Sequence, residues 1–210
     1  MPIDAALYPV NLVVAGRRCL VVGGGAVAAA KAAGLVRCGA DVDVVAAVIG
    51  PEVRSLDVTC HERPYRAGDV AGYRLVVAAT GDASLNREIY EEADAAGIWV
   101  NAADDPASCS FALPAVVRRG PITVAVGTGG RSPALASWLR ARLDEHLGPE
   151  YEILVELMTD ARAQVKAAGR STEAIDWRKA LDSDMLDLIR AGQVSRARER
   201  LRACLSSSSD

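Results

Sequence analysis

Short apolar runs alternate with helix-forming stretches along the first half of the chain. The runs are typical of parallel strands that are buried on both faces, and they lie at residues 18–22, 41–46, 58–62, 73–79 and 98–101. Residues 26–38 and 83–96 are rich in helix formers, and Gly39 and Gly97 follow them as helix stops. This alternation with short joints predicts an α/β fold with a doubly wound parallel sheet and right-handed crossovers.

The pattern changes after Phe111. Residues 111–117 and 122–126 predict two strands joined in a hairpin, and Ser132-Pro133 predicts the start of a helix that reaches His146. The remainder is helical in pattern and rich in arginine. The predicted organisation is an α/β domain at 1–113, a linking segment at 114–148 and a small helical C-terminal domain at 149–210.

The composition is that of an ordinary globular protein. Half of the residues are hydrophobic, and the formal net charge of −3 does not favour nucleic acid or an anionic membrane as a partner. The five cysteines are scattered, as expected for reduced thiols, and His61 and His146 have no ligand-spaced neighbours for a metal site. No apolar run approaches the roughly 20 residues that span a bilayer. We expect a cytoplasmic protein without a signal peptide.

A glycine-rich turn follows the first predicted strand. Residues 23–28, Gly-Gly-Gly-Ala-Val-Ala, have the G-x-G-x-x-A form of a dinucleotide-binding turn, which ends at a helix N-terminus suited to phosphates. Its place between a strand and a helix predicts a Rossmann-type domain, although a tight turn made only for packing is the alternative. The residues expected to contact the cofactor here are Gly23, Gly24, Gly25, Ala26 and Val27.

The end of the second strand lacks the acidic residue that commonly binds the ribose hydroxyls. Ala47 and Val48 stand there, and Asp43 lies too early, so we expect backbone groups of Ala47 and Val48 to contact the ribose. Thr80 and Asn101, at the ends of two later strands, are expected to contact the cofactor as well. No arginine lies right beside the strand end to hold a 2′-phosphate, so NAD is preferred over NADP.

Two further motifs lie downstream of the glycine turn. One is Asn-Ala-Ala-Asp-Asp-Pro at 101–106, followed by Ser-Phe-Ala-Leu-Pro at 110–114, and the other is the glycine-rich segment 124–136. Together with residues 21–28 and Lys31, they resemble the precorrin-2 dehydrogenase/sirohydrochlorin ferrochelatase family, which includes the N-terminal part of bacterial siroheme synthase. The resemblance covers about residues 7–148 in unbroken order.

The resemblance implies an NAD-dependent oxidation of precorrin-2, a tetrapyrrole, to sirohydrochlorin. In some members Fe²⁺ then enters the product as a transient substrate. It also implies a homodimer, with residues 114–148 as the dimerisation segment. The central aspartate of the family falls on Asp104, and a serine of its second glycine loop falls on Thr128. Whether chelation occurs stays open at this stage.

The residues support a catalytic role for Asp104 on separate grounds. It follows the carboxyl end of a parallel strand, where open α/β sheets bind ligands, and a carboxylate there can accept a proton while the cofactor accepts a hydride. A simple turn aspartate is the alternative. The expected contacts for the substrate carboxylates are Thr128, Gly129, Gly130, Arg131 and Ser132.

Two other classes of function share part of this pattern. A non-enzymatic NAD-sensing module needs the glycine turn but has no use for Asp104 beside a second glycine-rich loop. A different small NAD-dependent oxidoreductase also fits, because a fold alone does not fix the reaction.

Overall fold

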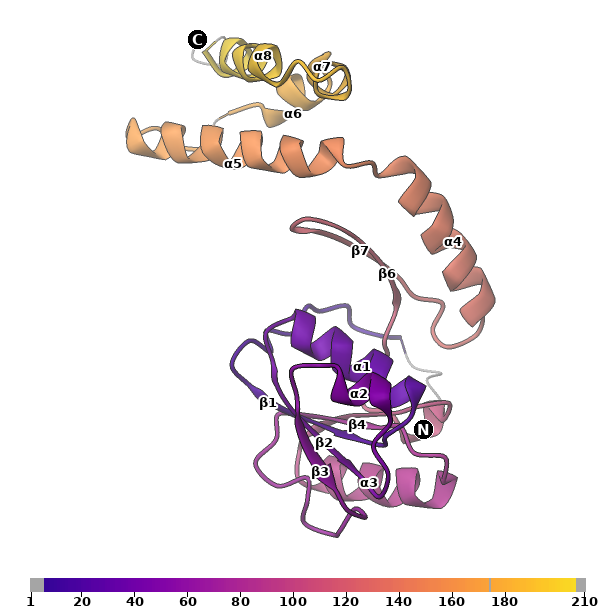
Figure 1. The fold of residues 1–210 in the computed structure, drawn as a ribbon. Helices are drawn as coiled ribbons and strands as arrows, with labels where there is room; N and C mark the ends of the chain where they lie inside the picture. Colours follow the sequence, from indigo (N-terminus) through magenta and orange to yellow (C-terminus); the bar gives the residue numbers. More distant parts are fainter. Residues whose placement is uncertain (1–5, 174, 207–210) are drawn as a thin grey trace. The chain divides into compact units, whose positions relative to one another are not determined.

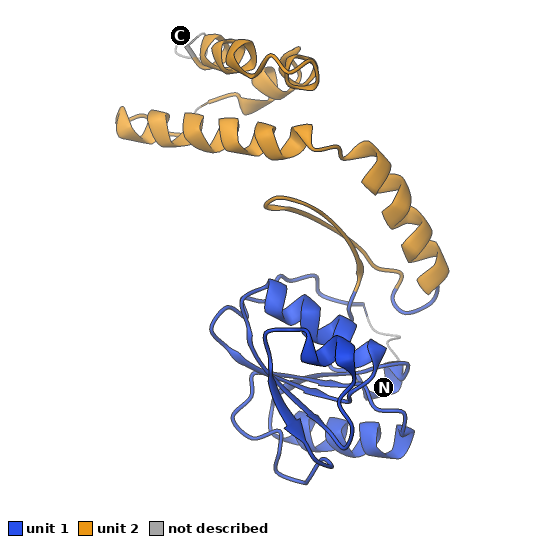
Figure 2. Ribbon diagram, in the orientation of Figure 1, with its two compact units in different colours: residues 1–113, 129–132 blue, residues 114–128, 133–210 orange. Residues whose placement is uncertain are grey.

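The chain folds into two compact units. The computed structural model describes residues 6–173 and 175–206. One unit comprises residues 1–113 with 129–132, and the other comprises residues 114–128 with 133–210 (Figure 2).

The first unit is built on a parallel five-stranded sheet with the strand order β3-β2-β1-β4-β5. Its strands are β1 (Arg18–Val22), β2 (Asp41–Ala46), β3 (Thr59–Glu62), β4 (Leu75–Ala78) and β5 (Trp99–Ala102). Its helices are α1 (Ala26–Arg37), α2 (Pro51–Arg54) and α3 (Ala83–Ala95), with a 3₁₀ turn η1 (Pro106–Ser108). The central place of β1 and the parallel pairing confirm the predicted doubly wound, Rossmann-type fold.

The two faces of the sheet are covered by different helices, as the apolar strands require. Cys19 and Val21 of β1 point into a core shared with α1 and α2, whereas Leu20 points into a second core with Ile89 and Ala93 of α3. Figure 1 shows α1 and α2 on one side of the sheet and α3 on the other. Since successive residues of a strand face opposite sides, a strand covered on both sides must be apolar throughout.

The second unit begins with an antiparallel hairpin and ends in helices. The hairpin strands are β6 (Ala115–Arg119) and β7 (Ile122–Val126). The helices are α4 (Pro133–His146), α5 (Glu150–Ala167), α6 (Trp177–Leu181), α7 (Met185–Arg190) and α8 (Val194–Ser206). The last four share one core, in which Leu157, Met185 and Leu201 are nearly fully buried. No helix in the described part of the chain is both long and apolar enough to cross a membrane.

One predicted strand is displaced. The apolar pattern predicts a strand over 111–117, but β6 starts at Ala115. Pro114 has no N–H for a ladder, and the backbone carbonyl of Phe111 instead accepts a hydrogen bond from the Asn101 side chain of the first unit. The segment before Pro114 therefore belongs to the first unit.

We predict that Ile89→Ala lowers the free energy of unfolding by about 2–5 kcal/mol, because Ile89 is fully buried between α3 and the sheet. Ile89→Val, which removes one methylene, is expected to cost only about 0.5–1.5 kcal/mol. Chemical denaturation followed by circular dichroism measures both. Equal losses in the two variants would mean that the site collapses around the smaller side chain.

Candidate functional site

The glycine turn after β1 is enclosed by backbone on two sides. Gly23 has φ +134°, and a Cβ there would lie 2.2 Å from the carbonyl oxygen of Ala79, which follows β4. A Cβ on Gly24 would lie 1.9 Å from the carbonyl oxygen of Val48, which follows β2. Both distances are far below van der Waals contact, so any side chain at these two positions would displace the neighbouring backbone. The two glycines are therefore required by the packing of the turn itself.

Gly25 is different, because a Cβ there would meet no protein atom within 4 Å. It is the N-cap of α1, and its carbonyl oxygen accepts a hydrogen bond from Ala29 N at 3.0 Å. The N–H groups of the first helical turn have no partner within the helix, and Ala28 packs fully buried against the sheet. Open space beside such N–H groups suits the pyrophosphate of a dinucleotide.

The loop after β2 lies against this turn. Gly50 N donates to Gly24 O at 2.9 Å, and Gly23 N donates to Val45 O at 2.9 Å. Ala47 and Val48, the residues predicted to contact the ribose, lie in this loop, and the Val48 side chain is exposed. The loop thus stands where the adenosine half of a dinucleotide binds in this type of fold.

The side chain of Asp43 does not belong to the surface formed by the glycine turn and the loop after β2. Its carboxylate accepts hydrogen bonds from Tyr73 Oη at 2.8 Å and Arg18 Nη2 at 3.2 Å, and it lies 2.9 Å from His61 Nε2. Burial alone would raise the pKa of Asp43, but the hydrogen bonds from His61, Tyr73 and Arg18 lower it below its ordinary value. Asp43 is therefore an internal tie between β1, β2 and β3, and it does not replace the missing ribose acid.

The structure brings one arginine to the β2 end that the sequence pattern missed. Arg54 Nε donates to Ile49 O at 3.2 Å, and Arg54 Nη2 lies 2.6 Å from Glu62 Oε2 at the end of β3. The short helix α2 folds Arg54 back onto the loop after β2. Gly50-Pro51, a helix-start signal, was the available indication of this helix. The expectation that no arginine lies right beside the strand end holds along the sequence but not in space.

Thr80 lies at the end of β4 and is held in place by α3. Its hydroxyl oxygen lies 2.7 Å from Asn86 Oδ1, and Asn86 Nδ2 donates to Thr80 O at 3.3 Å. Asp82 caps α3 by accepting from Ser84 N at 2.9 Å and from Leu85 N at 3.2 Å. These contacts fix the backbone of Thr80 beside the glycine turn.

Asp104 stands out by its backbone. Its φ of +61° is left-handed, and it is the one non-glycine residue with positive φ in the described part of the chain. Such a conformation costs free energy in an L residue and persists where the surroundings impose it, commonly at functional sites. Asp104 is also exposed, so its carboxylate is open to a ligand.

The loop that carries Asp104 is fastened at both ends by partly buried polar contacts. Asn101 Nδ2 donates to Phe111 O at 3.0 Å and to Cys109 Sγ at 3.3 Å. Cys109 Sγ in turn lies 3.2 Å from Asp105 O and 3.3 Å from Ala102 O. Burial is the main cause that raises the pKa of the Cys109 thiol, so the thiol stays protonated as a donor. Asn101, predicted to bind the cofactor, thus has its amide nitrogen engaged within this loop.

Backbone contacts connect the glycine turn to Asp104. Ala79, whose carbonyl adjoins Gly23, donates through its N–H to Val22 O at 2.8 Å. Its neighbour Ala78 accepts from Ala103 N at 2.8 Å, one residue before Asp104. The glycine turn, the β2 loop, Thr80 and Asp104 therefore share the carboxyl edge of one sheet.

The second glycine-rich loop divides between the two units. Residues 129–132 cluster with the first unit, whereas Thr128 belongs to the second. Gly129 and Gly130 have φ of +61° and +77° with open space around them, and Arg131 is exposed. Helix α4 starts at Pro133, directly after Ser132, as predicted.

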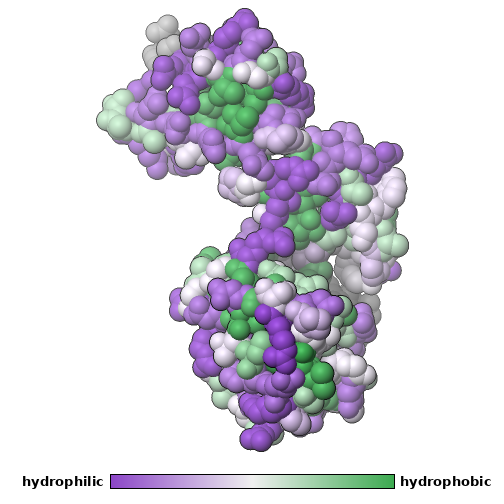
Figure 3. Space-filling model, viewed as in Figure 1, coloured by the Kyte–Doolittle hydropathy of each residue, from purple (hydrophilic) through white to green (hydrophobic). Residues whose placement is uncertain are grey.

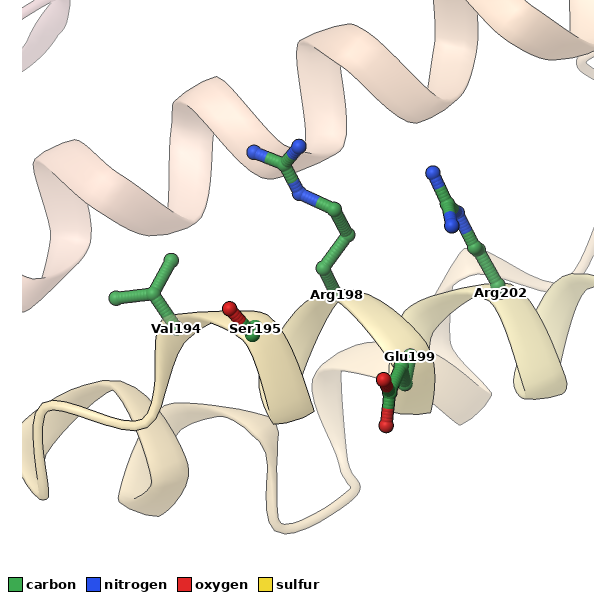
Figure 4. Close-up of a pocket in the computed structure, with 5 residues that line it drawn as sticks. All are labelled: Val194, Ser195, Arg198, Glu199 and Arg202. Atoms are coloured by element: carbon green, nitrogen blue, oxygen red, sulfur yellow. The ribbon is translucent and has the colours of Figure 1, made fainter.

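The second unit holds a separate hollow of about 410 Å³ on α8. Figure 4 shows that Arg198 and Arg202 extend from α8 toward the neighbouring helix, whereas Glu199 points away from them. Arg198 Nη2 already lies 3.9 Å from Asp160 of α5. The hollow lies in the second unit and contains no part of the sheet edge described above. Nowhere among the described residues are three His, Cys, Asp or Glu side chains gathered as metal ligands.

Comparisons with known proteins agree with this geometry. The family model NAD_binding_7, described as NAD(P)-binding, matches residues 10–115, and the model for the central part of sirohaem biosynthesis proteins matches residues 119–146. A siroheme synthase of Nitrosococcus oceani is 38% identical over 94% of this chain and 43% of its own length. One from Pseudomonas aeruginosa is 40% identical over 89% of this chain and 41% of its own length.

The chain thus spans less than half the length of the curated relatives it matches. A solved structure of SirC, a precorrin-2 dehydrogenase, superposes with a TM-score of 0.71 over 94% of this chain and 98% of that one. At 24% sequence identity, this likeness establishes the fold. Because the first family model covers half of the sequence, the chain belongs to the NAD(P)-binding family NAD_binding_7, and its next segment matches the central part of sirohaem biosynthesis proteins.

Proposed function

We propose that this chain catalyses the NAD-dependent dehydrogenation of precorrin-2 to sirohydrochlorin. The observation that carries the proposal is an exposed, left-handed aspartate, Asp104, on the same sheet edge as a glycine turn suited to a dinucleotide. The names of the relatives, siroheme synthase and precorrin-2 dehydrogenase, support the choice of substrate. The motifs at 101–106 and 124–136 support it independently of those names.

The reaction removes two hydrogens from the macrocycle, one as a hydride and one as a proton. Bound NAD⁺ supplies the hydride acceptor. In this proposal Asp104 accepts the proton, and the contacts of Asn101 and Cys109 fasten the loop that carries it. Gly25 and the start of α1 hold the pyrophosphate, and Thr80 lines the edge between them and Asp104.

The tetrapyrrole carries carboxylates, which need cationic and N–H partners. Thr128 to Ser132 supply such a loop in our proposal, with open backbone at Gly129 and Gly130 and an exposed guanidinium on Arg131. Insertion of Fe²⁺ into the product belongs to the same proposal as a second reaction, in which the iron is substrate and Asp104 accepts pyrrole protons.

The whole assignment is tested by incubating the purified chain with precorrin-2 and NAD⁺ and recording the absorbance of NADH and sirohydrochlorin. We expect equal amounts of both products. NAD⁺ binding without turnover would instead indicate a sensing module, and turnover restricted to other substrates would indicate a different oxidoreductase.

We predict that Asp104→Asn lowers the rate of dehydrogenation by about 100-fold or more, because the amide cannot accept the proton. The Kd for NAD⁺ is expected to stay within about tenfold of the wild-type value, since ground-state contacts survive. Stopped-flow rates and calorimetric titration measure the two quantities. A variant with full activity would remove Asp104 from the proposed mechanism.

Variants at Gly24 and Gly25 should distinguish a glycine needed for folding from one needed for cofactor binding. Gly25→Ala is expected to leave the melting temperature unchanged, because its Cβ meets no protein atom, while it weakens NAD⁺ binding by about tenfold or more. Gly24→Ala is expected to lower the melting temperature, because its Cβ would overlap the carbonyl of Val48. Differential scanning fluorimetry with and without NAD⁺ distinguishes the two. Equal thermal stability of both variants would contradict this description of the turn.

We also propose that the chain forms a homodimer through residues 114–148. Leu135 and Trp138 of α4 are 48% and 56% exposed and lie one turn apart on the helix, so a partner surface could cover both apolar side chains. On the face seen in Figure 3, hydrophobic patches interrupt the hydrophilic surface of the second unit.

We predict that light scattering gives the mass of two chains, and that Trp138→Glu shifts it to the mass of one chain by burying an unpaired charge at the interface. Leu181→Glu, at a 46% exposed position of α6, serves as the control and should leave the dimer intact. A wild-type chain that runs as a monomer at all concentrations would refute the dimer.

A further inference from the structure

We propose that the ion pair between Glu62 and Arg54 sets the preference of the dinucleotide site for NAD over NADP. Glu62 holds Arg54 and repels the 2′-phosphate, so the arginine is not free to bind that group. This inference rests on the proposed use of NAD, and it concerns how the same site selects its cofactor.

The pair lies at the place where this fold discriminates the two cofactors. The acid or arginine that contacts the 2′ position of the ribose commonly belongs to the end of the second strand. Glu62 is the register partner of Ala46, the last residue of β2, and so stands on the neighbouring strand at the same level. The loop after β2 packs closely against the glycine turn: Gly50 N donates to Gly24 O at 2.9 Å, and a Cβ on Gly24 would lie 1.9 Å from Val48 O.

The contacts of the pair hold the guanidinium against that loop. Arg54 Nη2 lies 2.6 Å from Glu62 Oε2, and Arg54 Nε donates to Ile49 O at 3.2 Å. Glu62 Oε1 accepts from Ile49 N at 3.3 Å. The carboxylate therefore binds the backbone N–H of Ile49, and the guanidinium binds the backbone carbonyl of the same residue. Hydrogen bonds from Arg54 and from Ile49 N keep the pKa of Glu62 below its ordinary value, and Glu62 is therefore charged at neutral pH.

The electrostatics favour NAD. A 2′-phosphate is a dianionic group that an arginine binds in a bidentate fashion when its N–H groups are available. Here the guanidinium already neutralises one carboxylate, and a phosphate entering beside Glu62 would meet a like charge a few ångströms away. The ribose 2′-hydroxyl of NAD carries no charge and meets no such penalty. The pair thus acts against NADP without needing the acid that β2 lacks.

The ion pair contributes little to the stability of the fold. A variant that breaks it therefore tests cofactor preference without a change in folding. The side chains of Arg54 and Glu62 are 51% and 47% exposed, and exposed ion pairs contribute little to stability. Glu62→Gln keeps the shape and one acceptor for Ile49 N while it removes the charge. The variant is expected to fold as the wild type does.

The experiment compares Kd for NAD⁺ and NADP⁺ by isothermal titration calorimetry of the full chain. In Glu62→Gln, we expect the ratio of the NADP⁺ Kd to the NAD⁺ Kd to fall by about tenfold or more, the size of one charge-assisted hydrogen bond. In the double variant Glu62→Gln/Arg54→Ala, the gain should shrink, because the freed arginine is lost while the repulsion by Glu62 stays removed. The matched control is Glu91→Gln, which breaks the exposed Arg87–Glu91 pair on α3 and should leave the ratio unchanged.

Two results would overturn the inference: an unchanged ratio in Glu62→Gln, or a gain of the same size after the removal of Arg54. A wild-type chain that binds both dinucleotides equally well would overturn it too. These outcomes are distinct from failure of the proposed function, because a chain that prefers NAD⁺ through this pair but does not oxidise precorrin-2 would sustain the inference and refute only the reaction.

Discussion

The close approach of three backbone segments at the glycine turn is the constraint on which the first unit depends. Gly23 adjoins the carbonyl after β4 and Gly24 adjoins the carbonyl after β2, and neither position has room for a Cβ. The turn therefore locks the ends of three neighbouring strands together. Because the turn uses two glycines for packing, only Gly25 remains to face a ligand, and its open surroundings leave space for the phosphates.

Backbone contacts of the same kind connect the glycine turn to Asp104, which follows β5, two strands away from β1 in the sheet. The hydrogen bond from Ala79 N to Val22 O joins the ends of β4 and β1, and the bond from Ala103 N to Ala78 O joins the ends of β5 and β4. Partly buried side-chain contacts of Asn101 and Cys109 then close the following loop on itself, and such contacts are stronger than those in open solvent. A left-handed Asp104 is sustained by this bracing, since an unsupported loop would relax to an ordinary turn.

Local pattern was enough to predict the parts of the fold that depend on local physics. The strand at 41–46, the glycine turn and the helix starting at Pro133 appear as predicted, because apolar runs, glycines and caps act within a few residues. The start of β6 was missed because a side chain ten residues earlier, Asn101, takes the carbonyl of Phe111. The position of Arg54 was missed because α2, only four residues long, falls below the length at which periodicity can be recognised.

That second omission shows why cofactor choice is harder to predict than cofactor binding. The glycine turn must satisfy a backbone constraint, so its residues are nearly dictated and easily recognised. Discrimination at the ribose needs only one charge in the right place, and several strands and loops can supply it. In this chain the charge that the β2 end lacks is found on β3 and is balanced by a residue of α2. The residues of β2 alone therefore show no charge at this place, although the neighbouring strand and helix supply Glu62 and Arg54 in the folded protein.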